Sequence, residues 1–216
     1  MSWNWVSQAV FVFLLAAGLF PSGFALAAGD EADTDKSPEI VFVPPEIGTP
    51  KDRMGAGTRN VTSDAASDLL LLVPADGGLT TQAFPPLIWR LTRGHRGDAI
   101  VKLGPSGMTA TELHISGPFP PGDYGLDLSR SNILLDTNRV YLWQLELLDP
   151  NTNAVVERSS GLIERLPKGF RSDTPAAAGL WFDALSELVD IGLSGRVQTT
   201  NPAELEQLLN SAGVSQ

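Results

Sequence analysis

Short apolar runs, separated by clusters of Gly, Pro, Asp and Asn, fill the middle of the chain. Such runs at regular short spacing are typical of antiparallel β proteins. The turn residues between them include Gly104-Pro-Ser-Gly107 and Pro120-Pro-Gly-Asp123. We therefore predict seven strands, at 69–73, 87–91, 99–103, 111–115, 124–128, 140–148 and 154–166.

The longest of these runs shows which face of the sheet is buried. Tyr141, Trp143, Leu145 and Leu147 alternate with polar residues such as Glu146. Alternation with period two places the four apolar side chains on one face of a strand. Two sheets packed through such faces predict an immunoglobulin-like or fibronectin-like sandwich over residues 39–168, and the short β-prone run Ile40–Val43 lies at its start.

The pattern changes to a helical period after Pro167, and residues 169–216 are predicted to form a helical pair docked on the sandwich. Thr174 is placed to cap a first helix with Pro175 at its first position. Asn201 and Pro202 begin a second helix that Gly213 ends. The apolar stripes expected to face inward are Ala177, Leu180, Trp181, Ala184, Leu185, Leu188 and Val189 in the first helix and Leu205, Leu208 and Leu209 in the second.

The N-terminal residues 1–28 have the pattern of a cleavable signal peptide. An uncharged run from Val10 to Phe20 precedes the helix breakers Pro21 and Gly23, and small residues then allow cleavage after Ala27 or Ala28. We expect an exported chain with no stable membrane anchor after cleavage. The segment before the run has no Lys or Arg, so retention of the run as an anchor stays open. Residues 29–38 are acidic and lack periodicity, which predicts a disordered leader.

Composition excludes several classes of function. The 216 residues include 25 acidic and 15 basic side chains, for a net charge of −10. Such a balance opposes binding to nucleic acid, whose phosphates require Lys and Arg. The chain has no cysteine, so it has no disulfide, no thiol nucleophile and no thiolate metal site.

Two segments are candidates for binding an anion. Gly55, Gly57 and Arg59 in Gly55-Ala-Gly-Thr-Arg59 can present backbone amides beside a guanidinium, although a glycine-permitted turn explains them as well. Arg90, Arg93, His95 and Arg96 form a basic cluster, for which a solvated hairpin end is the favoured interpretation. The two histidines, His95 and His114, have no metal-motif spacing, and we expect no metal site and no cofactor.

Carboxylates and tryptophans offer a second kind of chemistry. Two acids in a cleft would allow glycoside hydrolysis, and we favour solvent exposure or pairing with arginines instead. Trp89, Trp143 and Trp181 are candidate sugar platforms, but their periodic apolar rows favour a place in the core. The acids within or beside structured segments are Glu112, Glu146, Glu157, Glu164 and Asp183.

Several short motifs follow one another along the chain: Phe42-Val-Pro-Pro45, Gly55–Arg59, Leu71-Leu-Val-Pro74, Gly78-Leu-Thr80, Pro85–Trp89, Tyr141-Leu-Trp143, Gly161–Arg165 and Gly179–Leu185. In this order they resemble a family of exported bacterial proteins that is frequent in cyanobacteria and known as domain of unknown function number 928. The resemblance spans about residues 41–213 and implies a Gram-negative envelope location without a catalytic assignment. Within it, Trp181 and Asp183 are candidate binding or structural residues.

With no reaction centre in the sequence, we expect a periplasmic or otherwise exported protein that is not an enzyme. Its expected role is that of an interaction module presenting a sheet edge, a loop end or a helical face to another envelope protein or to a glycan. Two alternatives remain: a carbohydrate-active enzyme that uses two carboxylates, and a small-ligand or anion sensor.

Overall fold

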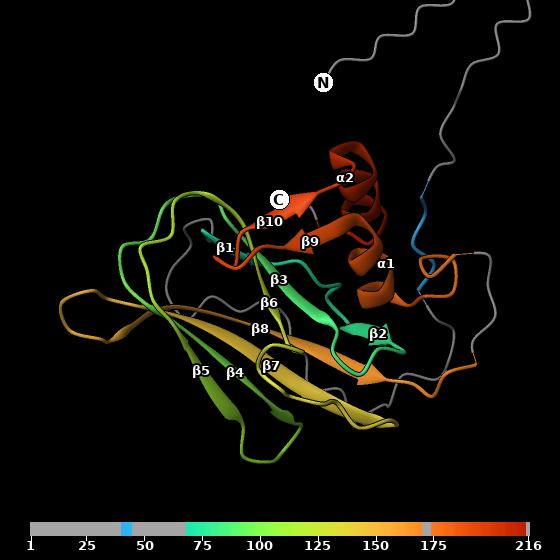
Figure 1. Ribbon diagram of the computed structural model, residues 1–216, viewed down its shortest axis with the longest axis horizontal. Coiled ribbons are helices and arrows are strands. Elements are labelled where there is room, and N and C mark those ends of the chain that lie inside the picture. Colours follow the sequence, from blue (N-terminus) through green and yellow to red (C-terminus); the bar gives the residue numbers. More distant parts are fainter. Residues whose placement is uncertain (1–39, 45–67, 170–173, 215–216) are drawn as a thin grey trace, which may run out of the picture. The chain divides into compact units, whose positions relative to one another are not determined.

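The computed structural model describes residues 40–44, 68–169 and 174–214 (Figure 1). The predicted signal peptide and acidic leader, with Ala27 and Ala28, lie outside the described residues. So does the segment that holds Gly55, Gly57 and Arg59.

The protein is mainly β, with two helices at its C-terminus, as the sequence predicts at this level. The larger sheet has five strands in the order β2-β8-β7-β4-β5, and a second sheet has three in the order β1-β3-β6. The larger sheet consists of β2 (Gly78–Thr80), β8 (Val155–Arg165), β7 (Arg139–Leu148), β4 (Ala99–Pro105) and β5 (Thr111–Ile115). The smaller consists of β1 (Leu69–Leu71), β3 (Pro86–Leu91) and β6 (Gly122–Asp127).

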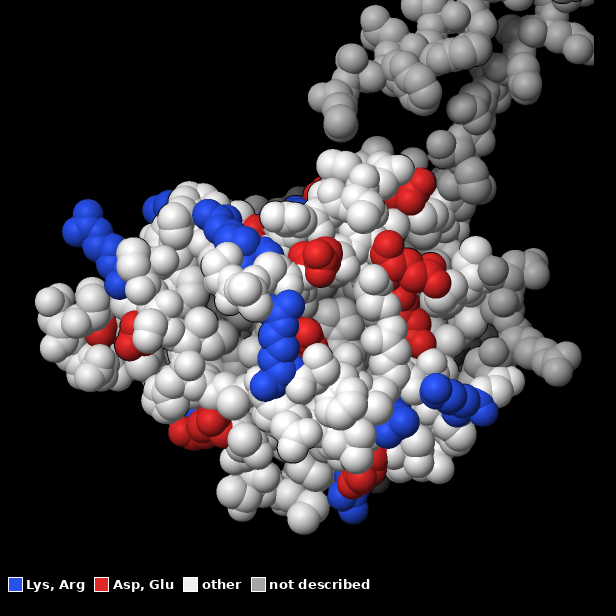
Figure 2. Space-filling model, viewed as in Figure 1, with Lys and Arg blue, Asp and Glu red and all other residues white. Residues whose placement is uncertain are grey.

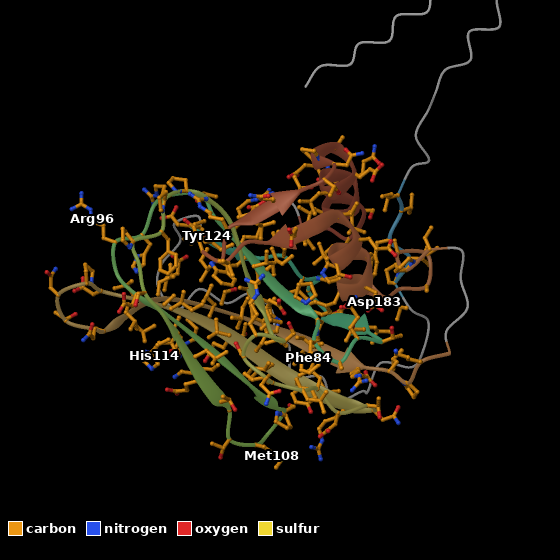
Figure 3. All side chains as sticks on the ribbon, in the orientation of Figure 1. Phe84, Arg96, Met108, His114, Tyr124 and Asp183 are labelled. Carbon is orange, nitrogen blue, oxygen red and sulfur yellow. The ribbon has the colours of Figure 1, made fainter. Side chains whose placement is uncertain are left out.

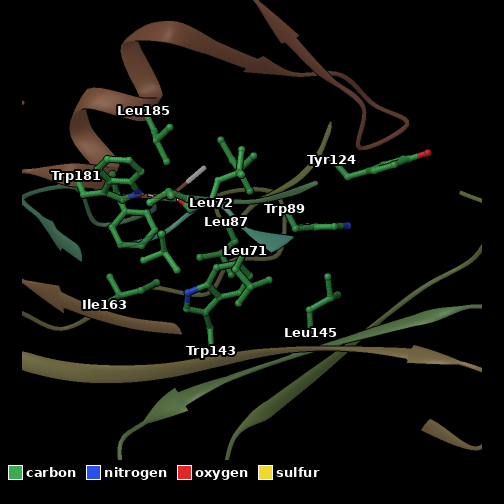
Figure 4. Packing of buried hydrophobic residues seen from close by; sticks show 14 of the residues in the cluster. Leu71, Leu72, Leu87, Trp89, Tyr124, Trp143, Leu145, Ile163, Trp181 and Leu185 are labelled. Carbon is green, nitrogen blue, oxygen red and sulfur yellow. Dashed lines mark hydrogen bonds between the residues drawn. The ribbon is translucent and has the colours of Figure 1, made fainter. Parts of the chain in front are cut away.

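Both sheets contribute side chains to one hydrophobic core (Figure 4). Trp143 and Leu145 of β7 face this core, opposite Leu87 and Trp89 of β3. The alternation seen in the sequence explains the arrangement, because the odd-numbered residues from Tyr141 to Leu147 are buried while Leu142 and Gln144 are more accessible. The exposed fractions of the Trp89, Trp143 and Trp181 side chains are at most 2%, which confirms their interpretation as core residues.

Two features of the sheets differ from the prediction. The expected sheets were antiparallel throughout, but β2 pairs with β8 in parallel, with Gly78 opposite Ile163. In addition, a short hairpin of β9 (Val189–Ile191) and β10 (Val197–Thr199) interrupts the region expected to be helical. Three-residue strands have too few positions to show a period, so these elements carry no clear sequence signal.

The first helix is shorter than predicted. It begins at Trp181 rather than near Thr174, and α1 (Trp181–Leu188) has no side-chain cap. Gly179 has φ +72, a left-handed conformation that favours glycine and interrupts a helix. Val189, expected in the helical stripe, begins β9 instead.

The second helix, α2 (Pro202–Ser211), follows the prediction closely. The Asn201 side chain accepts hydrogen bonds from the amides of Ala203 and Glu204, as an N-cap residue does. Leu205, Leu208 and Leu209 are buried, and Gly213 with φ +68 follows the helix end.

Residues 40–44 pack beside the helices as an irregular segment. Phe42 is 4% exposed, and its ring meets Trp181 edge-on at 5.1 Å. Its amide donates to the Ser211 hydroxyl at 2.9 Å, and the Val43 amide donates to the Ala176 carbonyl at 3.1 Å. The β-prone run seen in the sequence therefore packs against α1, α2 and the turn before α1, and does not form a strand.

Candidate functional site

Trp181 and Asp183, both singled out in the sequence, lie at the start of α1 and face the protein interior. The Trp181 indole is fully buried and donates from Nε1 to the Leu72 carbonyl at 2.9 Å. Buried indole N–H groups need such a partner. This residue therefore fixes α1 against the chain that follows β1 and offers no surface to a ligand.

Asp183 is 8% exposed, and hydroxyl and amide donors occupy its carboxylate. The hydroxyls of Thr80 and Thr81 each donate at 2.6 Å, and the Thr81 amide donates at 3.0 Å. A carboxylate acting as a catalytic base must accept a proton from substrate, and here both oxygens already accept bonds from the protein. In Figure 3, His114 lies on a different part of the molecule from Asp183. These hydrogen bonds join α1 to the end of β2, and we call the three residues Thr80, Thr81 and Asp183 the clamp.

Charged side chains cross the outer face of the five-stranded sheet. Lys102 Nζ lies 3.2 Å from Glu112 and 3.1 Å from Glu146, and Arg158 lies 2.6 Å from Glu146. Glu146 is only 2% exposed, and its carboxylate, as the main cause, raises the pKa of Lys102 above its ordinary value. The pairing with arginine expected for these acids is present at Glu146. The carboxylates of Glu112 and Glu146 are thus paired with cationic side chains of the same sheet, and these ion pairs link its neighbouring strands.

The basic cluster does not form an anion site. Arg90 makes a two-pronged contact with Asp123, at 2.7 and 3.0 Å, and also meets Glu206 at 2.9 Å. Hydrogen bonding to Asp123, as the main cause, raises the Arg90 pKa. Arg93 pairs with Asp68 at 2.6 Å. Arg96 alone of the three arginines projects from its loop without such a partner among the described residues (Figure 3).

His95 has a structural environment. Its Nε2 lies 2.9 Å from the Leu148 carbonyl, and its ring stacks on Phe119 at 6.4 Å. Among the described residues, no three His, Cys, Asp or Glu side chains come together as metal ligands would. No helix of the described part is long and apolar enough to cross a membrane.

An apolar hollow of about 190 Å³ opens between β5, β6 and the β9–β10 hairpin. Ile115, Phe119, Tyr124 and Leu193 contribute to its wall. Tyr124 stacks on Trp89 at 6.1 Å, and Arg196 lies 4.5 Å from the Tyr124 ring on which it packs. Because these aromatic faces are already covered by protein groups, the hollow suits a small apolar side chain better than a stacked sugar ring.

Arg130 lines both this hollow and a second one of about 180 Å³. Its guanidinium donates to the carbonyls of Ile191 and Gly192, at 2.8 and 3.0 Å, and lies 3.2 Å from Asp127. These bonds hold the β9–β10 hairpin against β6. Figure 2 shows acidic side chains gathered over the two helices beside this region, which makes that part of the surface unfavourable for an anion.

Strand β5 lies at the end of the five-stranded sheet, and no described strand pairs with its outer side. Hydrogen bonding alternates along an antiparallel strand. The Leu148 amide donates to the Asp98 carbonyl, so the backbone groups of even-numbered residues in β4 bond to β7. The backbone groups of the odd-numbered residues Ala99, Val101 and Leu103 therefore bond to β5. The backbone groups of Glu112 and His114 consequently point to the outer edge.

The side chains of β5 divide between the two faces of the sheet. Leu113 and Ile115 face inward and are half-buried, while Glu112 and His114 are exposed on the outer face. Figure 3 places His114 on this edge and Met108 at the turn that precedes it. The strand is recognisable in the sequence, but its position at the sheet edge is not, because sheet order depends on long-range pairing.

The described residues define a class: a mainly β protein with two C-terminal helices, in which the outer edge of β5 is unpaired and lies beside an apolar hollow. Residues 54–216 match the family model described as Domain of Unknown Function (DUF928), and the chain belongs to this family. No curated protein and no solved structure matches the chain. The resemblance seen in the sequence motifs is thereby confirmed.

Proposed function

We propose that the protein is an exported envelope protein and a non-catalytic interaction module, which binds an extended segment of another protein chain at the edge of β5. The observation that carries this proposal is the row of outward-facing backbone groups at Glu112 and His114. An added strand would satisfy these groups through main-chain hydrogen bonds. We also propose that the two sheets form an immunoglobulin-like or fibronectin-like sandwich.

The hollow beside β5 supports a strand as the ligand. Side chains of an added strand alternate between the two faces of the sheet. Those on the inner face would lie next to Leu113 and Ile115, and Ile115 is part of the wall of the hollow. The main chain would then give affinity, and an apolar side chain at the hollow would give specificity.

A protein segment fits this surface better than a glycan. Sugar binding at aromatic residues needs an exposed ring face, and Trp89 and Tyr124 are 2% and 4% exposed. Strand addition needs only backbone groups and an apolar contact, both of which β5 supplies.

The experiment that tests the edge uses a photo-cross-linking residue at His114 in cells of the native host, with the same residue at Asn151 in the exposed β7–β8 loop as a position control. We expect an adduct at 114 and none at 151. Glu112→Pro should abolish the adduct because it removes an outward-facing N–H, whereas Glu112→Gln, which keeps that N–H, should retain it. An adduct that survives Glu112→Pro would contradict strand addition.

The export proposal has its own test. Cleavage after Ala27 or Ala28 would give a mature chain that begins at Ala28 or Gly29. Mass spectrometry of the N-terminus of the protein from its host should find one of these ends. An intact Met1 would contradict cleavage and favour retention of the apolar run as an anchor.

A further inference from the structure

The geometry points to a second copy of this chain as the partner of β5, with the two β5 strands pairing antiparallel about a two-fold axis at Leu113. The inference rests on the proposed function, since it names the occupant of the same edge. Two-fold pairing joins the same patch on both copies, so the patch must be complementary to itself.

The backbone of β5 satisfies this condition. Centring the axis on Leu113 places Glu112 of each copy opposite His114 of the other. These two residues are the ones whose backbone groups face outward in the described structure. They would form hydrogen-bonded pairs on both sides of the axis, and Leu113, which bonds to β4, would occupy the non-hydrogen-bonded position between them.

The outer-face side chains are complementary in the same register. Directly opposed residues of antiparallel strands interact, and complementary polar side chains are favoured there. Glu112 keeps 51% of its side chain exposed despite its 3.2 Å contact with Lys102, and His114 is exposed. Each copy would therefore place a carboxylate opposite an imidazole whose N–H can donate to it, and symmetry supplies this pair twice.

The inner-face side chains agree with the same register. Leu113 would meet Leu113 of the other copy, and Thr111 would meet Ile115. Leu113 and Ile115 are half-buried within a single chain, so the pairing would remove further apolar surface from water.

Neighbouring two-fold registers are worse. An axis at Glu112 would place two carboxylates opposite each other, and an axis at His114 would place the two imidazoles together and leave Glu112 opposite Ser116. Like charges directly opposed destabilise a sheet. If one β5 strand slipped by a single residue along the other, side chains of the inner face would lie opposite side chains of the outer face. Of these two-fold registers, only the axis at Leu113 places each carboxylate opposite a side chain that can donate a hydrogen bond to it.

The dimer is expected to be weak. A five-residue edge is small beside the interfaces of stable complexes, and the net charge of −10 on each chain opposes association. Association should therefore be reversible and depend on protein concentration.

Sedimentation velocity of the full exported chain over a range of concentrations tests the inference. The wild type should form a reversible dimer. Glu112→Lys should weaken it about tenfold or more, since it removes the acceptor opposite each imidazole and puts a group that only donates in its place. The double exchange Glu112→His with His114→Glu should restore it, because each residue would again face its complement. Glu187→Lys, at an exposed position of α1, changes the net charge equally and should leave the dimer intact.

The outcomes separate this inference from the proposed function. A wild type that stays monomeric, or a dimer that Glu112→Lys does not weaken or the double exchange does not restore, would overturn the second copy as the partner. The proposed function would survive if the photo-cross-linker at His114 then trapped a different chain in a manner blocked by Glu112→Pro. Circular dichroism of each variant shows that the change lies in association rather than folding.

Discussion

The hydroxyl of Thr80 donates to the carboxylate of Asp183 at 2.6 Å, although the two residues are 103 positions apart in the chain. Thr80 ends β2, and Asp183 lies in the first turn of α1. The bond therefore joins the helical end of the protein to the edge of the five-stranded sheet opposite β5. Because the site is buried, its polar groups depend on each other for hydrogen bonds.

Asp183→Asn should destabilise the fold. The amide keeps one acceptor oxygen and replaces the other with a donor, so one threonine hydroxyl loses its acceptor and the other bonds to a neutral oxygen. Hydrogen bonds to charged groups contribute about 1.5–3 kcal/mol, and we expect a loss of about 2 kcal/mol in the free energy of unfolding, measured by urea denaturation.

A matched variant separates the clamp from a general effect of charge. Glu187→Gln, in the same helix and exposed, should change the free energy of unfolding by less than about 0.5 kcal/mol. Equal effects of the two variants would mean that the threonine contacts do not stabilise the protein.

Part of this contact can be predicted from the sequence. The motifs Gly78-Leu-Thr80 and Gly179–Leu185 contain residues that meet in the structure, and Asp183 is a candidate site residue within the second motif. That the two motifs touch each other depends on β2 pairing in parallel with β8. A three-residue strand has no periodicity that would place it.

Gly78 lies beneath the aromatic residues that begin α1, and Gly78→Ala should disturb this contact. A Cβ at this position would lie 2.7 Å from Phe182 Cε2 and 2.9 Å from Trp181 Cβ. Both neighbours are fully buried and have little room to move, so overpacking should cost about 1–3 kcal/mol. Thermal and urea denaturation would measure the loss.

Gly192→Ala is the control, because its nearest neighbour would lie at an ordinary 3.4 Å. We expect a change below about 0.5 kcal/mol there. If Gly78→Ala is as well tolerated as Gly192→Ala, α1 does not pack on β2 as closely as described.

Lys102→Met should reduce stability in a manner that depends on pH. Glu146 is the main cause of the raised Lys102 pKa. A raised pKa means that the ammonium stabilises the fold fully below the unfolded pKa, about 10.4, and that this contribution is lost as pH rises through the folded value. Solvent reaches Lys102, so we expect a difference of about 1 kcal/mol near neutral pH.

Urea denaturation of the wild type and Lys102→Met from pH 7 to 12 would measure this difference. It should stay constant to about pH 10 and then shrink, while Lys168→Met, at an exposed position, should show no such trend. A difference that grows above pH 10 would contradict the direction of the pKa shift.

The sequence predicted the long strands better than the C-terminal segment, for physical reasons. In β7, period-two alternation over ten residues leaves little ambiguity about which face is buried. In α1, the apolar stripe continued past both true ends, since Leu180 and Val189 are apolar but non-helical. Gly179 ends the stripe on one side through its left-handed backbone, a conformation that a lone glycine does not reveal.

Arg130 holds the β9–β10 hairpin, and Arg130→Lys should loosen this hairpin without unfolding the protein. The arginine donates to two carbonyls, of Ile191 and Gly192, while it contacts Asp127. Lysine keeps the charge but lacks the planar fork that makes these bonds together. Hydrogen exchange of residues 189–199 should accelerate, because local opening needs less free energy than global unfolding, and exchange in β7 should not change. Equal protection of the hairpin in both proteins would mean that two other contacts hold it without Arg130: the backbone pairing of β9 with β10 and the hydrogen bond from the Gly125 amide to the Gly195 carbonyl. Arg130 would then line the two hollows without stabilising the hairpin.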